Sequence, residues 1–239
     1  MKLGIMQPYL YPYLGYFSLI KHTDRWIIFD TIQYIEHGWI NRNQIIHPSR
    51  PETMYFTVPL QKHSRETIIK DILIDDASGY QNRILGQLTA SYKKRAPYFK
   101  IVYAMVEDAL MQNFSDIVSL NTYTLNQVCT YLGIPFNYEV YSNMNLEILP
   151  VHNPGEWALN ISIALGADEY INPPGGIDIF NQKKFDSNGI ELSFLKINLK
   201  PYNQKKPQFF ESLSILDAMM FNPPETINKM LDDYTIIKK

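Results

Sequence analysis

The chain has 239 residues, 46% of them apolar and 19% charged, which excludes a disordered, collagen-like or coiled-coil protein. Its 22 Lys and Arg residues against 24 Asp and Glu residues give a net charge of -2, which excludes the broad basic face of a dedicated nucleic-acid-binding protein. The single cysteine, Cys129, excludes an internal disulfide and is predicted to be a small buried hydrophobe. No apolar run reaches the roughly 18 residues of a membrane span, and the N-terminus lacks a leader-like pattern, so we expect a cytoplasmic protein with no membrane insertion.

The first thirty residues predict a strand, a loop, a helix and a second strand. Apolar residues fill 2–6 and 26–29, and a helix-like spacing of apolar residues covers 15–22. The intervening loop, 7–13, contains two prolines. Because ligands bind beyond the carboxyl ends of parallel strands, we expect this loop and Asp30 to face one crevice.

The middle of the chain predicts a pair of strands followed by helices. Residues 53–60 and 68–74 have strand-like composition, and the polar segment between them suggests that the two pair with each other. Apolar residues then recur at helical spacing from 78 to 132 and indicate three helices. We interpret 78–132 as a helical insertion within one α/β domain that covers residues 1–239.

The last third alternates strands and helices. Strands are predicted at 136–140, 169–172 and 190–197, helices at 156–165, 213–221 and 224–231, and a turn at 173–176. The whole pattern predicts an α/β fold with a Rossmann-like core built from both ends of the chain.

The first candidate site is the loop that leads into the first helix. Its prolines should hold the tyrosines in place, and the amides at the following helix start suit an anion. The residues predicted to bind a ligand here are Gln7, Tyr9, Tyr13, Gly15 and Tyr16. The alternative, that the rings only pack beneath the loop, is equally compatible with the residues. A further alternative is a degenerate HIGH-type nucleotidyltransferase turn at Tyr13-Leu14-Gly15-Tyr16, although both histidines of that motif are absent.

The second candidate site is the polar segment that follows Asp30. Trp39, Asn41 and Arg42 combine an aromatic face, an amide and a guanidinium, which suit sugars and phosphates. Asp30 and His37 are the candidate proton acceptors. A plain surface loop is the alternative.

Three further features are weaker. Gly175, Gly176 and Asp178 follow a short strand, where backbone can approach a ligand and a carboxylate can hold a ribose hydroxyl, although a capped turn explains them as well. The basic loop from 200 to 206 suits an anionic nucleotide sugar or a solvated face. The five histidines are too dispersed to predict a metal site, and no cofactor is predicted.

The chain resembles the WbqC-like family of bacterial proteins. The resemblance rests on Gln7-Pro8-Tyr9, Pro12, Gly15-Tyr16-Phe17, Asp30, Gln33 and Gly38-Trp39-Ile40-Asn41-Arg42-Asn43. It extends to Leu165-Gly166-Ala167, Tyr170, Gly175-Gly176, Phe185, Gly189-Ile190, Tyr202 and Phe210 to Asp217.

The resemblance implies a role in O-antigen and other surface-polysaccharide (lipopolysaccharide) biosynthesis. By that association the protein resembles a transferase that attaches an acyl or aminoacyl group to the amine of a nucleotide-linked amino sugar. Its partners would be the nucleotide-linked sugar and an activated acyl or aminoacyl donor, and a homo-oligomer is left open. The sequence shows neither a Walker loop nor a coenzyme A site, so the donor is not identified. A non-catalytic nucleotide-sugar-binding protein of the same pathway is the alternative.

Within this interpretation each candidate residue has an expected role. Tyr9, Tyr13 and Trp39 would stack on the base or the sugar. The amides of Gln7 and Asn41 would orient hydroxyl groups, and the guanidinium of Arg42 would hold a phosphate. Asp30 or His37 would accept the proton of the amine.

Overall fold

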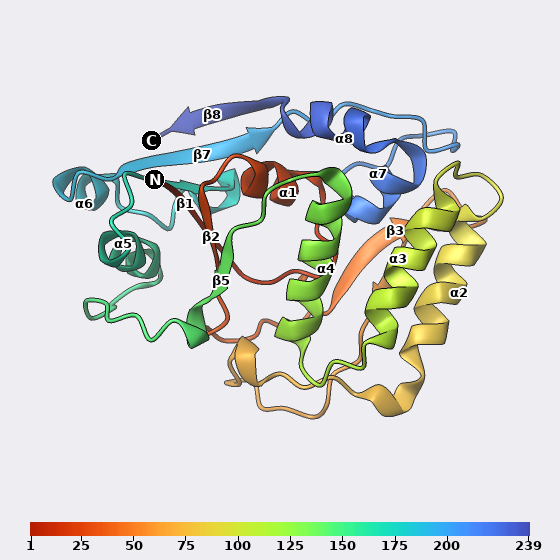
Figure 1. The fold of residues 1–239 in the computed structure, drawn as a ribbon, viewed down its shortest axis with the longest axis horizontal. Helices are drawn as coiled ribbons and strands as arrows, with labels where there is room; N and C mark the ends of the chain where they lie inside the picture. Colours follow the sequence, from red (N-terminus) through yellow and green to blue (C-terminus); the bar gives the residue numbers. More distant parts are fainter.

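The computed structural model describes residues 1–239 and shows a mixed α/β fold with a six-stranded sheet, a two-stranded ribbon and eight α-helices (Figure 1). The strand order in the sheet is β5-β2-β1-β6-β7-β8. The first five of these are parallel to their neighbours, whereas β8 is antiparallel to β7. The strands are β1 (Lys2–Met6), β2 (Arg25–Ile28), β5 (Tyr138–Val140), β6 (Glu169–Asn172), β7 (Glu191–Ile197) and β8 (Tyr234–Lys238).

The central strands are apolar because both faces of the sheet are covered. Leu3 and Ile5 of β1 belong to one buried cluster, and Trp26 and Ile28 of β2 belong to the other. Gly4 of β1 is opposite Trp26 of β2, and a Cβ atom on Gly4 would come within 2.5 Å of the Trp26 ring. Glycine at this position therefore leaves room for the indole beside β1.

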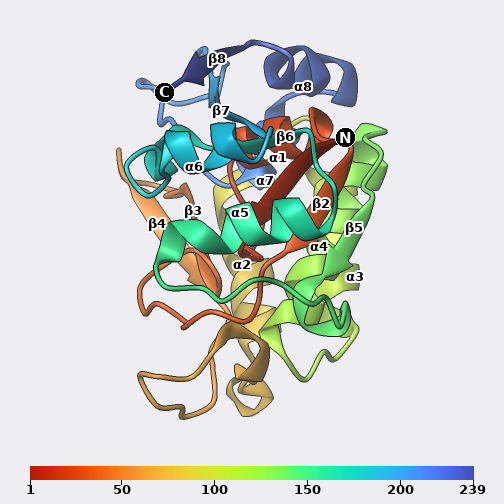
Figure 2. The same ribbon diagram turned by 90° about the vertical axis from the view of Figure 1, so that its left-hand side faces the viewer.

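Helices from different parts of the chain cover the two faces. Helices α5 (Pro154–Ala164) and α6 (Gln182–Ser187) lie on one side, where Figure 2 shows them in front of the sheet. Helices α1 (Leu14–Lys21), α4 (Ile117–Leu132) and α8 (Pro224–Leu231) lie on the other side. Helices thus cover both faces of the sheet, as is typical of a predominantly parallel sheet.

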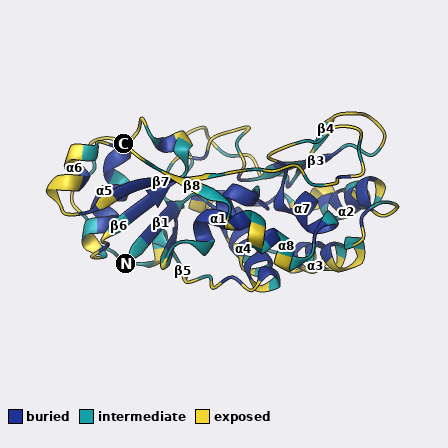
Figure 3. Cartoon of the chain, turned by 90° about the horizontal axis from the view of Figure 1, so that it is seen from above, coloured by how far each residue is buried: buried dark blue, intermediate teal, exposed yellow.

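The segment between β2 and β5 extends the molecule beyond the sheet. It contains the ribbon of β3 (Arg42–Ile46) and β4 (Thr53–Thr57) and helices α2 (Tyr80–Tyr92) and α3 (Phe99–Met111). These elements pack with α7 (Ile215–Phe221). One hydrophobic cluster extends from the sheet into this end, and Figure 3 shows buried residues in both parts.

Most of the predicted elements are confirmed, including the parallel strands and the three helices between 78 and 132. The predicted strand at 68–74 is wrong: this segment contains a short 3₁₀ turn at Ile69–Asp71, and β4 pairs with β3 instead. Ile69, Ile72 and Ile74 are buried in the larger hydrophobic cluster, so the apolar composition of the segment reflects burial without a sheet ladder. Sequence patterns also missed the short helix α6 and the edge strand β8. The one-domain interpretation with an insertion at 78–132 stays a prediction.

Two smaller findings concern residues singled out in the sequence. Cys129 is buried, as predicted, and desolvation raises the pKa of its thiol to about 12. No helix combines the length and the hydropathy that crossing a membrane requires.

We expect Gly4→Ala to destabilise the fold by about 1–3 kcal/mol, because the added methyl group overlaps the Trp26 ring. Gly86→Ala is the matched control: Gly86 lies in the exposed surface of α2 with nothing within 4 Å of its Cβ position, so the change should stabilise by roughly 0.5–1 kcal/mol. Urea unfolding of both variants measures the difference, and equal effects would contradict the close packing at Gly4.

Candidate functional site

A cavity of about 1050 Å³ lies beside β1, where the order in which the chain adds strands to the sheet reverses. From β1 the chain proceeds to β2 and β5 on one side, and it later returns to β6 and β7 on the other. The cavity wall includes Met6 and Gln7 at the carboxyl end of β1 and Asn172 and Pro173 at the carboxyl end of β6. Ligands bind at this position in open parallel sheets.

The cavity wall combines aromatic rings and amides with aliphatic residues such as Ile5, Met6 and Ile179. The rings belong to Tyr9, Tyr13, Tyr16, Phe29, Trp39, Trp157, Tyr170 and Phe180. The amides belong to Gln7, Gln33, Asn43, Asn153 and Asn172. No Lys, Arg, Asp or Glu contributes to the wall, and His152 is its only histidine. The cavity therefore suits an uncharged ligand with ring faces and hydroxyl groups.

The first wall is the proline-containing loop, and buried side chains fix its backbone. The Asn43 side-chain amide donates to the carbonyl oxygens of Leu10 and Tyr11 at 3.0 and 2.9 Å. The Ser214 hydroxyl donates to the same Tyr11 carbonyl at 2.8 Å. Tyr11 adopts φ 41°, a left-handed conformation that costs free energy in any residue other than glycine. These bonds hold the turn in that strained shape.

A second amide joins the loop to the segment that carries Trp39. Asn121 of α4 is buried, and its side chain donates to the carbonyl oxygens of Pro8 at 2.9 Å and of Ile40 at 2.7 Å. The Leu10 amide also donates to the Trp39 carbonyl at 3.0 Å. The two segments that carry the candidate sites therefore lie side by side, and of the second candidate site only Trp39 reaches the cavity wall.

Tyr9 and Tyr13 line the cavity, and their phenol groups form no hydrogen bond within the protein. Burial raises the pKa of both groups, so both stay protonated at neutral pH and can donate to a ligand. Gly15 is absent from the wall, but a Cβ atom there would lie 2.4 Å from the Tyr13 ring. The lack of a side chain at Gly15 therefore leaves room for the Tyr13 ring. The Tyr16 hydroxyl donates to the Gln7 carbonyl at 2.8 Å and is not free for the triphosphate contact of a HIGH-type turn.

The opposite wall follows β6. Asn172 is only 8% exposed, and its side-chain amide has no hydrogen-bond partner in the protein although it reaches the cavity. Gly175 and Gly176 lie beside it, and a Cβ atom on Gly176 would come within 2.5 Å of the Asn172 nitrogen. Gly176 therefore makes room for the amide, which is available to a ligand. Asp178 does not reach the cavity.

The third wall is the start of α5, with His152, Asn153 and Trp157. Glu156 accepts hydrogen bonds from the Lys184 ammonium at 2.5 Å and from the His152 backbone amide at 2.7 Å. These bonds, the one from Lys184 above all, lower the pKa of the Glu156 carboxyl to about 2. The carboxylate thereby fixes the backbone that presents His152.

Arg42, the cation predicted to hold a phosphate, does not line the cavity. The Arg42 guanidinium is 4.3 Å from the centre of the Tyr55 ring and donates to the Gly38 and His37 carbonyls. Trp39, which does reach the cavity, has its ring 6.4 Å from that of Tyr55. Arg42 has no carboxylate partner.

Several candidate residues have other contacts. Asn41 accepts from the Tyr34 hydroxyl at 2.8 Å and donates to the Val58 carbonyl at 3.0 Å. Asp30 is buried, and its carboxylate accepts the backbone amide of Ser142 at 3.1 Å and its hydroxyl at 2.6 Å. His37 lies in an exposed turn with φ 63°. None of the three reaches the cavity, so the geometry favours structural roles for Asn41 and Asp30.

The structure thus brings together part of the predicted site. The predicted residues on the cavity wall are Gln7, Tyr9, Tyr13, Tyr16, Trp39, Gly175 and Gly176. Those elsewhere are Gly15, Asp30, His37, Asn41, Arg42 and Asp178. The basic loop does not reach the cavity either, because Lys200 pairs with Asp233 and Tyr202 donates to Asp217.

The sequence analysis missed His152, Asn153, Trp157 and Asn172. Asn172 ends a predicted strand, a position that favours ligand contacts in parallel sheets. Asn153 followed by Pro154 is a helix-start pattern, with proline at the first helical position. That signal places a helix start, but only the fold shows that it borders the cavity.

The chain belongs to the WbqC-like protein family, whose model matches residues 7–229. It is similar to "Uncharacterized protein Rv1507c" of Mycobacterium tuberculosis, with 28% identity over 223 residues that cover 92% of this chain and 93% of the relative. No solved structure matches the chain.

We expect Asn43→Ala to lower the free energy of unfolding by about 1–3 kcal/mol, because it leaves the buried Leu10 and Tyr11 carbonyls short of donors. The matched control is Asn126→Ala on the exposed side of α4, which should change stability by less than about 0.5 kcal/mol. Urea unfolding measures both. Near-equal values would show that the loop does not depend on Asn43.

The Glu156 carboxyl predicts a pH dependence. Its folded-state pKa lies below the usual 4.5, so its stabilising contribution is present above about pH 4.5 and is lost as the pH falls toward 2. Glu156→Gln should therefore flatten the fall of the melting temperature in that window, as measured by circular dichroism. Asp178→Asn is the control and should leave the profile unchanged; an unaltered profile for Glu156→Gln would contradict the assignment.

Proposed function

We propose that the cavity binds the sugar of a nucleotide-linked amino sugar and that the protein transfers an acyl or aminoacyl group to the amine of that sugar. The observation that carries the proposal is a wall that combines aromatic rings, amides and aliphatic residues and has no Lys, Arg, Asp or Glu. Pyranose rings have apolar faces that pack on aromatic rings, and their hydroxyl groups pair with amides and phenols. The unpartnered groups of Asn172, Tyr9 and Tyr13 supply such contacts.

The charge distribution indicates which part of the substrate enters. A phosphate buried among rings and amides would lose its hydration without gaining a cation, which is costly. The diphosphate would therefore stay outside the cavity, beyond Trp39, where the Arg42 guanidinium is held over the Tyr55 ring without a carboxylate partner. Trp39 and Tyr55 are each 42% exposed and offer faces on which a base can stack.

The topology agrees with a Rossmann-like interpretation. Numbered along the chain, the five parallel strands have the order 3-2-1-4-5, which is found in doubly wound nucleotide-binding folds. The cavity lies between the first and fourth of these strands, where such folds bind their ligands. This supports a nucleotide-linked substrate over a free sugar.

The transfer step needs a proton acceptor and a hydrogen-bond donor. The neutral amine would attack the acyl carbonyl, the carbon–nitrogen bond would form, and the bond to the donor's leaving group would break. The proton released by the amine would pass to a base, and the leaving group would take up a proton in turn. His152 is the one imidazole on the wall, and an imidazole can both accept and donate a proton, so it is the candidate for this exchange. The phenols of Tyr9 and Tyr13 suit the oxyanion of the tetrahedral intermediate.

A non-catalytic protein that binds the same nucleotide sugar is the second candidate. The observation that favours it is the position of the carboxylates: Asp30 is engaged by Ser142, Glu156 by Lys184, and neither reaches the cavity. Binding needs only the rings and amides, whereas transfer also needs the base.

The first test is a binding test. Thermal shifts over uridine- and thymidine-diphosphate amino sugars should identify a ligand, since saturation at 100 times the dissociation constant adds about 2.7 kcal/mol to stability. Asn172→Ala and Tyr13→Phe should each weaken binding by about 2- to 10-fold through one lost hydrogen bond. Asn126→Ala should leave it unchanged. No shift with any nucleotide sugar would refute the proposed substrate class.

The second test separates transfer from binding. The protein is incubated with the bound nucleotide sugar and activated acyl or aminoacyl donors, and mass spectrometry detects the acylated product. His152→Gln should retain ligand affinity and lose at least about 100-fold in product formation. Asp30→Asn and His37→Gln, made in parallel, test the bases predicted from the sequence. Ligand binding without product from any donor would favour the binding protein.

A further inference from the structure

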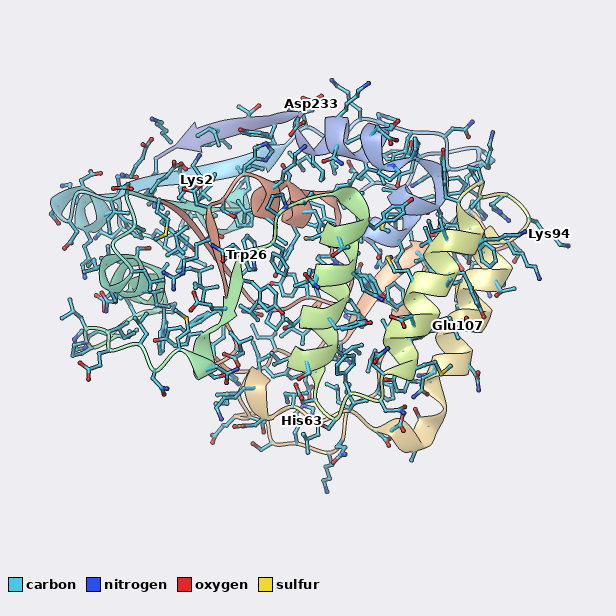
Figure 4. All side chains as sticks on the ribbon, viewed as in Figure 1. Lys2, Trp26, His63, Lys94, Glu107 and Asp233 are labelled. Carbon is cyan, nitrogen blue, oxygen red and sulfur yellow. The ribbon has the colours of Figure 1, made fainter.

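A cluster of positive side chains forms where three segments meet at the end of the molecule that is farthest from α6 (Figure 1). The segments are the turn between β3 and β4, the end of α2, and the loop after β7. The cluster consists of Arg50, Lys93, Lys94, Arg95, Lys205 and Lys206. Figure 4 shows Lys94 at the outer edge of the molecule beside the end of α2.

Hydrogen bonds join the three segments directly. The Lys206 ammonium donates to the carbonyl oxygens of His47 at 2.7 Å and of Arg50 at 3.2 Å. The Arg95 guanidinium donates to the Pro48 carbonyl at 2.8 Å. Both cations therefore hold the β3–β4 turn and connect it to the end of α2 and to the loop after β7.

The cluster has almost no compensating negative charge. Arg50 pairs with Glu52 at 2.9 Å, and the other five cations have no carboxylate within 4.0 Å. Burial lowers the pKa of Lys206, and the positive charge of the neighbouring Arg95 lowers it further. Lys206 and Arg95 therefore repel each other. With Glu52 included, the cluster carries a formal charge of +5. The whole chain carries -2, so the remainder carries -7.

The form of the cluster restricts its partner. None of the three main cavities includes any of these six residues. The aromatic residues of the three segments, among them Tyr98, Tyr202 and Phe209, are buried or half-buried, which disfavours the stacking platform of a protein that binds single-stranded nucleic acid. Exposed Pro51, Pro97 and Pro207 flank the cations and add uncharged surface. These properties suit a broad anionic surface that is contacted from outside.

We propose that this cluster docks the protein on an anionic lipid surface. Each exposed lysine or arginine adds electrostatic attraction to negatively charged headgroups, and the attraction decreases with salt. The excess negative charge on the rest of the chain disfavours every other orientation, so the same end of the molecule would face the lipid. The association is peripheral and reversible and requires no inserted helix.

The test is sedimentation of the full chain with large vesicles. Vesicles of phosphatidylcholine with about one third phosphatidylglycerol should bind the protein, vesicles of pure phosphatidylcholine should not, and raising the salt from about 50 to 500 mM should release it. The variant Lys93→Glu, Lys94→Glu and Lys205→Glu should lose binding by about 10-fold or more. These three side chains are exposed and form no hydrogen bond or ion pair, so the fold should persist, as circular dichroism checks.

The matched control reverses three exposed, unpaired lysines outside the cluster: Lys62→Glu, Lys183→Glu and Lys229→Glu. It has the same net charge as the first variant and should keep most of the vesicle binding. Equal losses in the two variants, equal binding to neutral vesicles, or no binding at low salt would each overturn the proposal. Binding to a short RNA that depends on Lys93, Lys94 and Lys205, without binding to vesicles, would also overturn it.

Discussion

The cavity depends on two asparagine side chains that donate to backbone carbonyls. Asn43, on the β3 strand, holds the turn at Leu10 and Tyr11, and Asn121, on α4, holds Pro8 and Ile40. Both amides are buried, and buried carbonyls without donors are costly. The helices and the ribbon beyond the sheet therefore do more than enlarge the core, because they supply the donors that shape the first wall of the site.

Charge is segregated across the molecule. The cavity wall contains no Lys, Arg, Asp or Glu. The cations of the β3–β4 turn, the end of α2 and the loop after β7 lie together at the end of the molecule farthest from α6. The carboxylates nearest to the site serve the backbone: Asp30 holds Ser142, and Glu156 holds the residues before α5. This separation lets a substrate place its uncharged part in the cavity and its phosphates outside, which is the arrangement that our proposal requires.

The sequence predicts those parts of the fold that local patterns determine. The apolar runs of β1 and β2 and the periodic helices between 78 and 132 were recognised, and so was the loop that Gln7, Tyr9 and Tyr13 share. The run at 68–74 was misassigned because burial among helices and burial in a sheet produce the same apolar composition. The hydrogen bond from Asn43 to Leu10 depends on tertiary structure that no local spacing encodes, and so does the presence of His152 and Met6 on one cavity wall.

The strained turn at Tyr11 limits how the site can be changed. Its left-handed backbone is maintained from outside, by Asn43 on the ribbon and Ser214 at the start of α7, and these lie about 30 and 200 residues further along the chain. A peptide that contained only residues 7–17 would relax to ordinary backbone angles and scatter its tyrosines. The arrangement of these tyrosines therefore cannot be transferred as a short motif, and substitutions that are meant to alter the cavity have to change the rings and leave the asparagines in place.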